Sequence, residues 1–173
     1  MGEMHPASDV ERGYRTLCVG HTGVTVSDMR KSCGFYRDIL GFEVSEPLRL
    51  SGGAVARITG VPDAELDVAY VRCSGHVLEL LCFVRPEHRQ RSTLRTCDPG
   101  FFHLCFKVRG LDAVVQAVRA AGFEATSRIE TFAEGPARGM RVVYVRDPDG
   151  VVLELAEEPA GVCFEDLFFP SPA

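Results

Sequence analysis

The chain has 173 residues, 46% of them hydrophobic and 25% charged, with a formal net charge of −5 at pH 7. This length suits one globular domain or two small modules, and the acidic balance disfavours nucleic acid as a partner. No apolar run approaches the roughly 20 residues that span a bilayer, and the polar N-terminus lacks the apolar core of a secretory signal. A cytoplasmic protein with no membrane or nucleic-acid partner is therefore expected.

Seven cysteines are scattered along the chain without a Cys-x-x-Cys pair. An odd number at irregular spacing argues against a disulfide framework or a zinc ribbon and is typical of reduced thiols. We expect Cys18, Cys82 and Cys105 to be small core residues.

The first half is predicted to form a strand, a helix and three further strands. Ser27 or Asp28 can cap the helix, and Gly41 marks its end. Alternating apolar residues predict the strands. In chain order the expected elements are a strand at 18–26, a helix to about 39, a strand at 42–50, a loop in the glycine-rich segment 50–65, and a hairpin of strands 66–73 and 77–84.

The second half follows the same order. A helix at 111–121 ends at Gly122, and Asp-Pro-Asp-Gly at 147–150 is a strong signal for a hairpin turn. The expected elements are strands at 101–108 and from 123–127, a loop at 134–139, and hairpin strands at 140–145 and 151–156. Segment 85–99 is expected to link the two halves.

The two halves repeat one another in their polar residues as well. Each begins with a histidine in a strand-like run, His21 or His103, and each ends with Val-Leu-Glu-Leu, which contains Glu79 or Glu154. Each helix is followed by Gly-Phe-Glu, at 41–43 and 122–124. An internal duplication that keeps histidine first and glutamate last is therefore indicated.

These glutamates interrupt apolar strands, where an ionised carboxylate is costly to bury unless it is paired or binds a metal. Successive strand residues face opposite ways, so Glu79 shares a face with Val77 and Leu81, while Leu78 and Leu80 face the helix. Convergence of the two histidines and two glutamates on one concave face would provide a site for a divalent transition metal.

A single histidine or glutamate in a strand is more often a core or surface residue than a ligand. The repeated order favours a metal site for the set of four. The remaining candidates are assigned to a terminus, a turn, the linker or the surface: His5, His76, His88, Asp147, Asp149, Glu43 and Glu124.

Two segments, FYRDILGFEV at 35–44 and VVYVRDPDGVVLEL at 142–155, resemble hallmarks of the vicinal oxygen chelate superfamily. This group includes glyoxalase I, methylmalonyl-CoA epimerase, extradiol dioxygenases, and fosfomycin- and bleomycin-resistance proteins. The resemblance implies an α+β, glyoxalase-like fold in which two tandem βαβββ modules form a half-barrel sheet, and a homodimer. The expected divisions are an extension (1–15), first module (16–84), linker (85–98), second module (99–158) and tail (159–173).

The superfamily's metal positions fall on His21, Glu79, His103 and Glu154, an order similar to that of bacterial glyoxalase I. The resemblance implies a lyase or isomerase that uses one divalent ion (Ni, Co, Zn, Mn or Fe) and stabilises an enediolate or enolate of a small-molecule substrate chelated through vicinal oxygens. Glu154 or Glu79 would be the catalytic base. Two alternatives stay open: an Fe(II)-dependent extradiol-type dioxygenase, and a metal-free antibiotic-binding resistance protein.

Two further segments suggest partners. The linker contains Arg85, Arg89, Arg91 and Arg95, which predict either a solvated surface or contacts to an anionic substrate. The tail contains Phe164, Leu167, Phe168 and Phe169, a dense apolar cluster that predicts docking on the chain's own sheet or at a dimer interface.

Overall fold

A computed structural model of the protein describes residues 13–163. The first module contains β1 (Thr22–Thr25), α2 (Met29–Gly34), the π-helical turn η1 (Phe35–Ile39), β2 (Glu43–Val44), β3 (Leu48–Ser51), α3 (Gly53–Thr59), β4 (Glu65–Cys73) and β5 (His76–Arg85). The second contains β6 (Leu104–Lys107), α4 (Leu111–Ala120), β7 (Glu130–Thr131), β8 (Arg141–Arg146) and β9 (Val152–Glu157). The predicted Phe-rich tail contacts lie outside the described residues.

Each module has one mixed sheet. The strand order is β1-β5-β4-β2 in the first, where β3 also pairs with β4, and β6-β9-β8-β7 in the second. In both, the strand before the helix pairs in parallel with the last strand of the module. This arrangement confirms the predicted α+β fold with two βαβββ-type modules.

Local signals explain the helix boundaries. The Asp28 carboxylate accepts a hydrogen bond of 3.0 Å from the Lys31 N–H and so caps α2. Gly41 and Gly122 have φ of 75° and 81°, a conformation that glycine adopts with little strain, and each lies just after a helix. Both predicted helix ends are therefore confirmed.

Segment 42–65 departs from the prediction. The expected strand at 42–50 is divided into β2 and β3, and the division contains Pro47, whose missing N–H cannot join a strand ladder. The expected loop contains the short helix α3, which buries none of its residues. The nearby Gly52, Gly53 and Gly60 concealed the helix-forming run from Ala54 to Ile58. In the second half, the strand expected at 123–127 is reduced to a single β-bridge between Ala125 and Val145.

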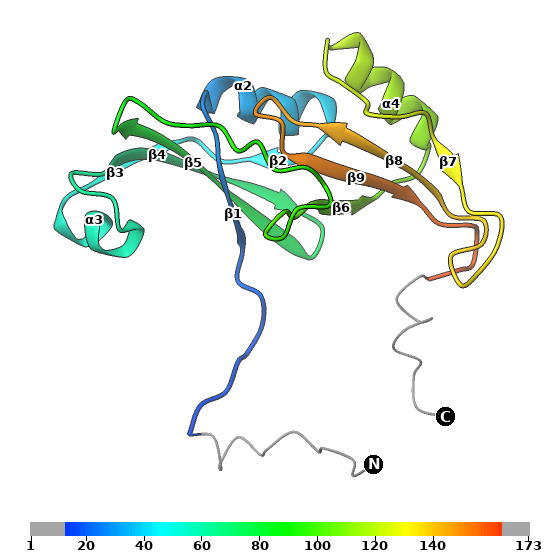
Figure 1. The fold of residues 1–173 in the computed structure, drawn as a ribbon, viewed down its shortest axis with the longest axis horizontal. Helices are drawn as coiled ribbons and strands as arrows, with labels where there is room; N and C mark the ends of the chain where they lie inside the picture. Colours follow the sequence, from blue (N-terminus) through cyan, green and yellow to red (C-terminus); the bar gives the residue numbers. More distant parts are fainter. Residues whose placement is uncertain (1–12, 164–173) are drawn as a thin grey trace.

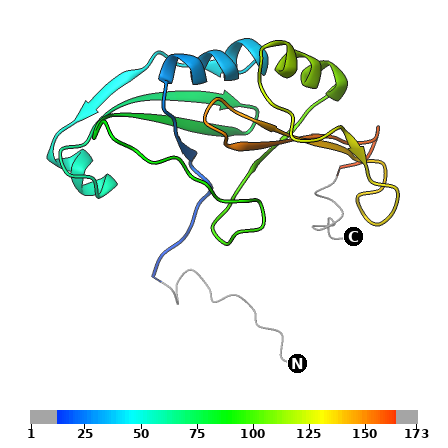
Figure 2. The ribbon, with the colours of Figure 1, turned by 45° about the horizontal axis from the view of Figure 1, so that its top comes forward.

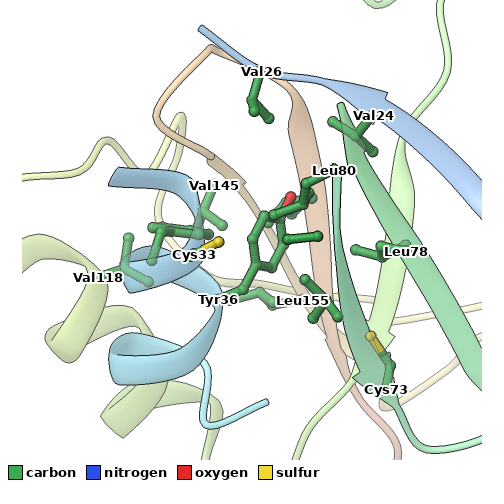
Figure 3. Close-up of a cluster of buried hydrophobic side chains, with 14 of the residues drawn as sticks. Val24, Val26, Cys33, Tyr36, Cys73, Leu78, Leu80, Val118, Val145 and Leu155 are labelled. Carbon is green, nitrogen blue, oxygen red and sulfur yellow. The ribbon is translucent and has the colours of Figure 1, made fainter. Parts of the chain in front are cut away.

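The core lies between the sheets and the helices α2, η1 and α4, which lie on one side of both sheets, whereas α3 lies on the other (Figures 1 and 2). Phe35 and Tyr36 are almost fully buried, and the Phe35 ring packs edge-on against Phe123 at 4.8 Å. Figure 3 shows Tyr36 in a cluster with Leu80 of the first module and Leu155 of the second. The two modules therefore share one hydrophobic core.

The β8–β9 turn fastens the two modules together. The buried Asp147 carboxylate accepts hydrogen bonds from the N–H groups of Asp149 and Val151 at 2.9 and 2.8 Å, and from the Tyr36 hydroxyl at 3.4 Å. Asp149 accepts a bond of 2.8 Å from the Ser27 N–H. Burial raises the pKa of Asp147, while these N–H donors oppose the shift. Both residues form the turn as predicted, and both also bind the first module.

The alternation of side chains decides which face of each sheet is free. Leu78 and Leu80 of β5, and Leu153 and Leu155 of β9, are fully buried in the core. Glu79 and Glu154 lie between them in sequence and so project from the opposite side. We call this side of both sheets, away from α2 and α4, the glutamate face. The predicted orientation of both glutamates agrees with this burial pattern.

The cysteine prediction was partly wrong. All seven thiols are free, as expected, but the buried ones are Cys33 and Cys73. Cys18 is exposed because it lies before β1, and Cys105 is exposed because it lies on the glutamate face. Cys82, near the end of β5, is partly buried.

Within residues 13–163, no helix is both long and apolar enough to cross a bilayer.

The turn makes a stability prediction. Replacing Asp147 with alanine removes three hydrogen bonds and leaves the buried Tyr36 hydroxyl without its acceptor, so the free energy of unfolding should fall by about 2–4 kcal/mol. Asp149→Ala, which loses the single bond from Ser27, should cost about 1 kcal/mol. Urea unfolding at one protein concentration measures both; equal losses would contradict the assigned role of Asp147.

Candidate metal centre

The parallel strand pairs bring histidine and glutamate together in the same way in both modules. In the first, Gly23 of β1 is the register partner of Glu79 on β5. In the second, Cys105 of β6 is the partner of Glu154 on β9. The histidine stands two residues before that partner each time, directly before the strand begins, and contacts the glutamate. The duplicated register therefore positions an imidazole beside a carboxylate twice.

In the first module, His21 Nε2 lies 3.2 Å from Glu79 Oε2. The Glu79 side chain is 17% exposed and His21 is 48% exposed, so the pair is open to solvent on the histidine side. Tyr70, directly across from Glu79 on β4, donates a hydrogen bond of 3.0 Å from its hydroxyl to Glu79 Oε1. This bond raises the pKa of the Tyr70 phenol, with burial and the Glu79 charge adding to it.

In the second module, His103 Nε2 lies 2.8 Å from Glu154 Oε2, and the side chains are 37% and 19% exposed. Tyr144, across from Glu154 on β8, places its ring 5.3 Å from the His103 ring. Burial, followed by the Glu154 charge, raises the pKa of Tyr144. Although Cys105 as a residue is exposed, partial burial of its thiol, followed by the Glu154 charge, raises the pKa of that thiol to about 11.

Both pairs suit a divalent ion. Two ligands that bind a metal at about 2.1 Å and at right angles lie about 3.0 Å apart. The nitrogen–oxygen separations of 3.2 and 2.8 Å fall on either side of that value. Imidazole nitrogen and carboxylate oxygen are also donors that divalent transition metals accept. Each module therefore carries two adjacent side chains whose chemistry and spacing fit a divalent ion.

The structure brings the four predicted ligands together as two pairs. Among residues 13–163 of one chain, no group of three or more histidine, cysteine, aspartate or glutamate side chains is close enough to hold a metal ion. Each His–Glu pair is thus half of the predicted four-ligand set, and the two pairs lie on different sheets. Convergence of all four stays a prediction.

Tyr70 and Tyr144 are site neighbours that the sequence prediction missed. A sequence signal for them exists, because Val-x-Tyr-Val-Arg occurs at 68–72 and again at 142–146, each time on the strand before Val-Leu-Glu-Leu. The predicted hairpins would have placed each tyrosine opposite its glutamate once the register was known.

Most other candidates have structural partners. His76 shares a 2.9 Å hydrogen bond with the Thr22 hydroxyl at the edge of the first sheet. The linker arginines contact groups of this chain. Arg85 lies 3.6 Å from Glu65, Arg89 donates to the carbonyls of Phe83 and Pro86, Arg91 lies 3.9 Å from Asp149, and Arg95 lies 2.7 Å from Asp98. An anionic substrate at the linker stays a prediction.

A cavity of about 290 Å³ is lined by residues that flank the second pair in sequence. Val152 lines it from β9, two residues before Glu154 and on the same face. The linker supplies Leu94 and the start of the second module supplies Phe102, which are 46% and 53% exposed, and Arg146 of β8 is a further lining residue. The cavity wall thus combines apolar side chains with polar ones, among them the Arg146 guanidinium and the Asp149 carboxylate.

Comparison with known proteins agrees with the fold and the repeated hallmarks. Residues 19–155 match the Glyoxalase/Bleomycin resistance protein/Dioxygenase superfamily. The chain belongs to this superfamily. The predicted family is therefore confirmed.

Relatives within the glyoxalase superfamily include enzymes. The chain is 32% identical over 154 residues to a 2-epi-5-epi-valiolone epimerase from Actinomyces sp., covering 86% of this chain and 84% of the relative. It is 26% identical over 142 residues to mitochondrial methylmalonyl-CoA epimerase from Mus musculus, covering 80% and 72%. A glyoxalase family protein from Bacillus cereus has the same fold, with a TM-score of 0.74, 21% identity, and coverage of 83% and 95%.

Proposed function

We propose that the protein is a divalent-metal-dependent isomerase or lyase of the glyoxalase–epimerase type, with epimerisation as the favoured reaction. The observation that carries the proposal is the repeated register that sets His21 against Glu79 and His103 against Glu154, at 3.2 and 2.8 Å. Core packing alone gives no reason for the same pair at the same register in both modules. The epimerase relatives support a reaction that removes and returns a proton beside a carbonyl group.

The proposed chemistry divides between the ion and the protein. A divalent ion bound by these four residues would supply Lewis-acid stabilisation of negative charge on a substrate carbonyl oxygen. Glu154 or Glu79 would take the proton from the adjacent carbon and return it. Both glutamates are largely shielded from solvent, and each lies on the glutamate face beside a more exposed histidine.

We further propose that the complete site forms between two copies of the chain. One chain supplies two separate pairs, whereas protein sites for divalent transition metals commonly use three or four ligands. In a two-fold dimer, the first module of one chain can face the second module of its partner, and symmetry then produces two equal sites with four ligands each.

Proton transfer can be tested directly in D₂O. The protein, reconstituted with Ni²⁺, Co²⁺ or Mn²⁺, should catalyse deuterium incorporation, followed by NMR, into at least one of three substrates: 2-epi-5-epi-valiolone, methylmalonyl-CoA, or a thiol adduct of a 2-oxo aldehyde. Glu154→Gln should lower that rate by about 10²–10⁴-fold, because the amide cannot accept the proton.

The matched control is Glu124→Gln, which changes an exposed glutamate outside both pairs and should leave the rate unchanged. Oxygen consumption by the Fe(II)-loaded protein with a catechol, without deuterium exchange, would instead favour the dioxygenase. Wild-type protein that takes up no stoichiometric ion would favour the metal-free binder.

A mixing experiment tests the shared site. One variant loses the first pair (His21→Ala with Glu79→Ala), and the other loses the second (His103→Ala with Glu154→Ala). Neither homodimer should then bind stoichiometric metal, since every shared site would lack half of its ligands. Unfolding and refolding the two together at equal amounts should restore about a quarter of the wild-type metal sites, because half of the dimers are mixed and each contains one intact site.

Elemental analysis of the refolded dimer measures this recovery. A site built within one chain would show no recovery, because neither variant has both pairs. Two wild-type samples mixed and refolded in the same way give the reference value for complete sites.

A further inference from the structure

The duplicated motif Val-x-Tyr-Val-Arg gives each His–Glu pair a tyrosine. Tyr70 of β4 is the register partner of Glu79, and Tyr144 of β8 is the register partner of Glu154. Residues paired across antiparallel strands project from the same face, so both tyrosines lie on the glutamate face. The two modules thus begin from the same arrangement of three side chains.

The tyrosines nevertheless contact different members of their pairs. The Tyr70 hydroxyl bonds to Glu79 Oε1 at 3.0 Å, while His21 Nε2 is 3.2 Å from Oε2 of the same carboxylate. Both oxygens of Glu79 are therefore engaged. The Tyr144 ring instead lies over the His103 ring, at 5.3 Å and an interplanar angle of 36°.

The strand on the other side of each glutamate also differs. Gly23 is the neighbour of Glu79 and contributes no side chain, whereas Cys105 is the neighbour of Glu154 and brings a thiol beside the carboxylate. A hydroxyl that donates to a carboxylate forms a strong, charge-assisted hydrogen bond, and a thiol is a weak donor. The histidine contact is shorter for Glu154, at 2.8 Å against 3.2 Å, but the carboxylate oxygen that the histidine does not contact is held by a hydroxyl donor only in Glu79.

We propose that Tyr70 is a positioning residue that holds Glu79 as a one-oxygen metal ligand and thereby makes the two halves of the site chemically unequal. With Oε1 bonded to the hydroxyl, Glu79 offers Oε2, on the His21 side, to an ion. Glu154 lacks an equivalent hydroxyl donor in the described contacts and retains the freedom to leave the ion and move the substrate proton. This inference rests on the proposed metal-dependent function and assigns unlike roles to its two glutamates.

The test compares Tyr70→Phe with Tyr144→Phe in the full-length protein. Calorimetric titration with Ni²⁺ should show about tenfold weaker binding for Tyr70→Phe, because groups that orient metal ligands are typically worth 10–100-fold in affinity. Tyr144→Phe should stay within about twofold of wild type, since phenylalanine keeps the ring contact with His103. The visible spectrum of the Co²⁺ form should change in Tyr70→Phe alone, because only there does a ligand change its orientation.

The outcomes separate this inference from the proposed function. Wild-type metal binding with an unchanged affinity in Tyr70→Phe, or an equal loss in both variants, overturns the role of Tyr70 and leaves the proposed function standing. A wild-type protein that binds no ion overturns both. Thermal melting of each apo variant checks the fold. Tyr70 is 40% exposed, and phenylalanine keeps the aromatic ring at both positions, so both variants should melt close to wild type. An affinity loss explained by unfolding would count against the positioning role.

Discussion

The parallel pairing of the first and last strands of each module is the constraint on which the candidate site depends. Histidine and glutamate are more than 50 residues apart in the first module and about as far apart in the second, so only this register brings them into contact. A slip of one residue would turn each glutamate toward the helices, where an unpaired carboxylate is costly. Hydrophobic burial of Leu78, Leu80, Leu153 and Leu155 opposes such a slip.

The shared core determines which surface is left for chemistry. Phe35 and Tyr36 pack against both modules, and Asp147 and Asp149 tie the second module to the first. All three core helices consequently lie on one side of the sheets (Figure 2). The opposite side keeps its polar residues, including both His–Glu pairs. Packing on one face is therefore what leaves the glutamate face open to a partner or a substrate.

Duplication produced a symmetric framework with unequal side-chain contacts. The two modules share strand order, register, and the set of histidine, glutamate and tyrosine. Small differences, such as Gly23 against Cys105, alter how each carboxylate is held. An enzyme that must both bind an ion and transfer a proton benefits from such a division, since a firmly held carboxylate is a good ligand and a freer one is a better base. The proposed roles of Glu79 and Glu154 follow from this difference.

The sequence by itself determined the α+β class, the two modules, the helix ends at Gly41 and Gly122, the hairpin at 147–150 and the faces of Glu79 and Glu154. These features follow from local periodicity, turn residues and internal repetition, which short segments carry. Only the tertiary structure decided the break near Pro47, the helix α3, the burial of Cys33 and Cys73, the tyrosine contacts, and the separation of the four predicted ligands into two pairs. Those depend on long-range register and on how one module packs against the other, and a local pattern in the sequence contains neither.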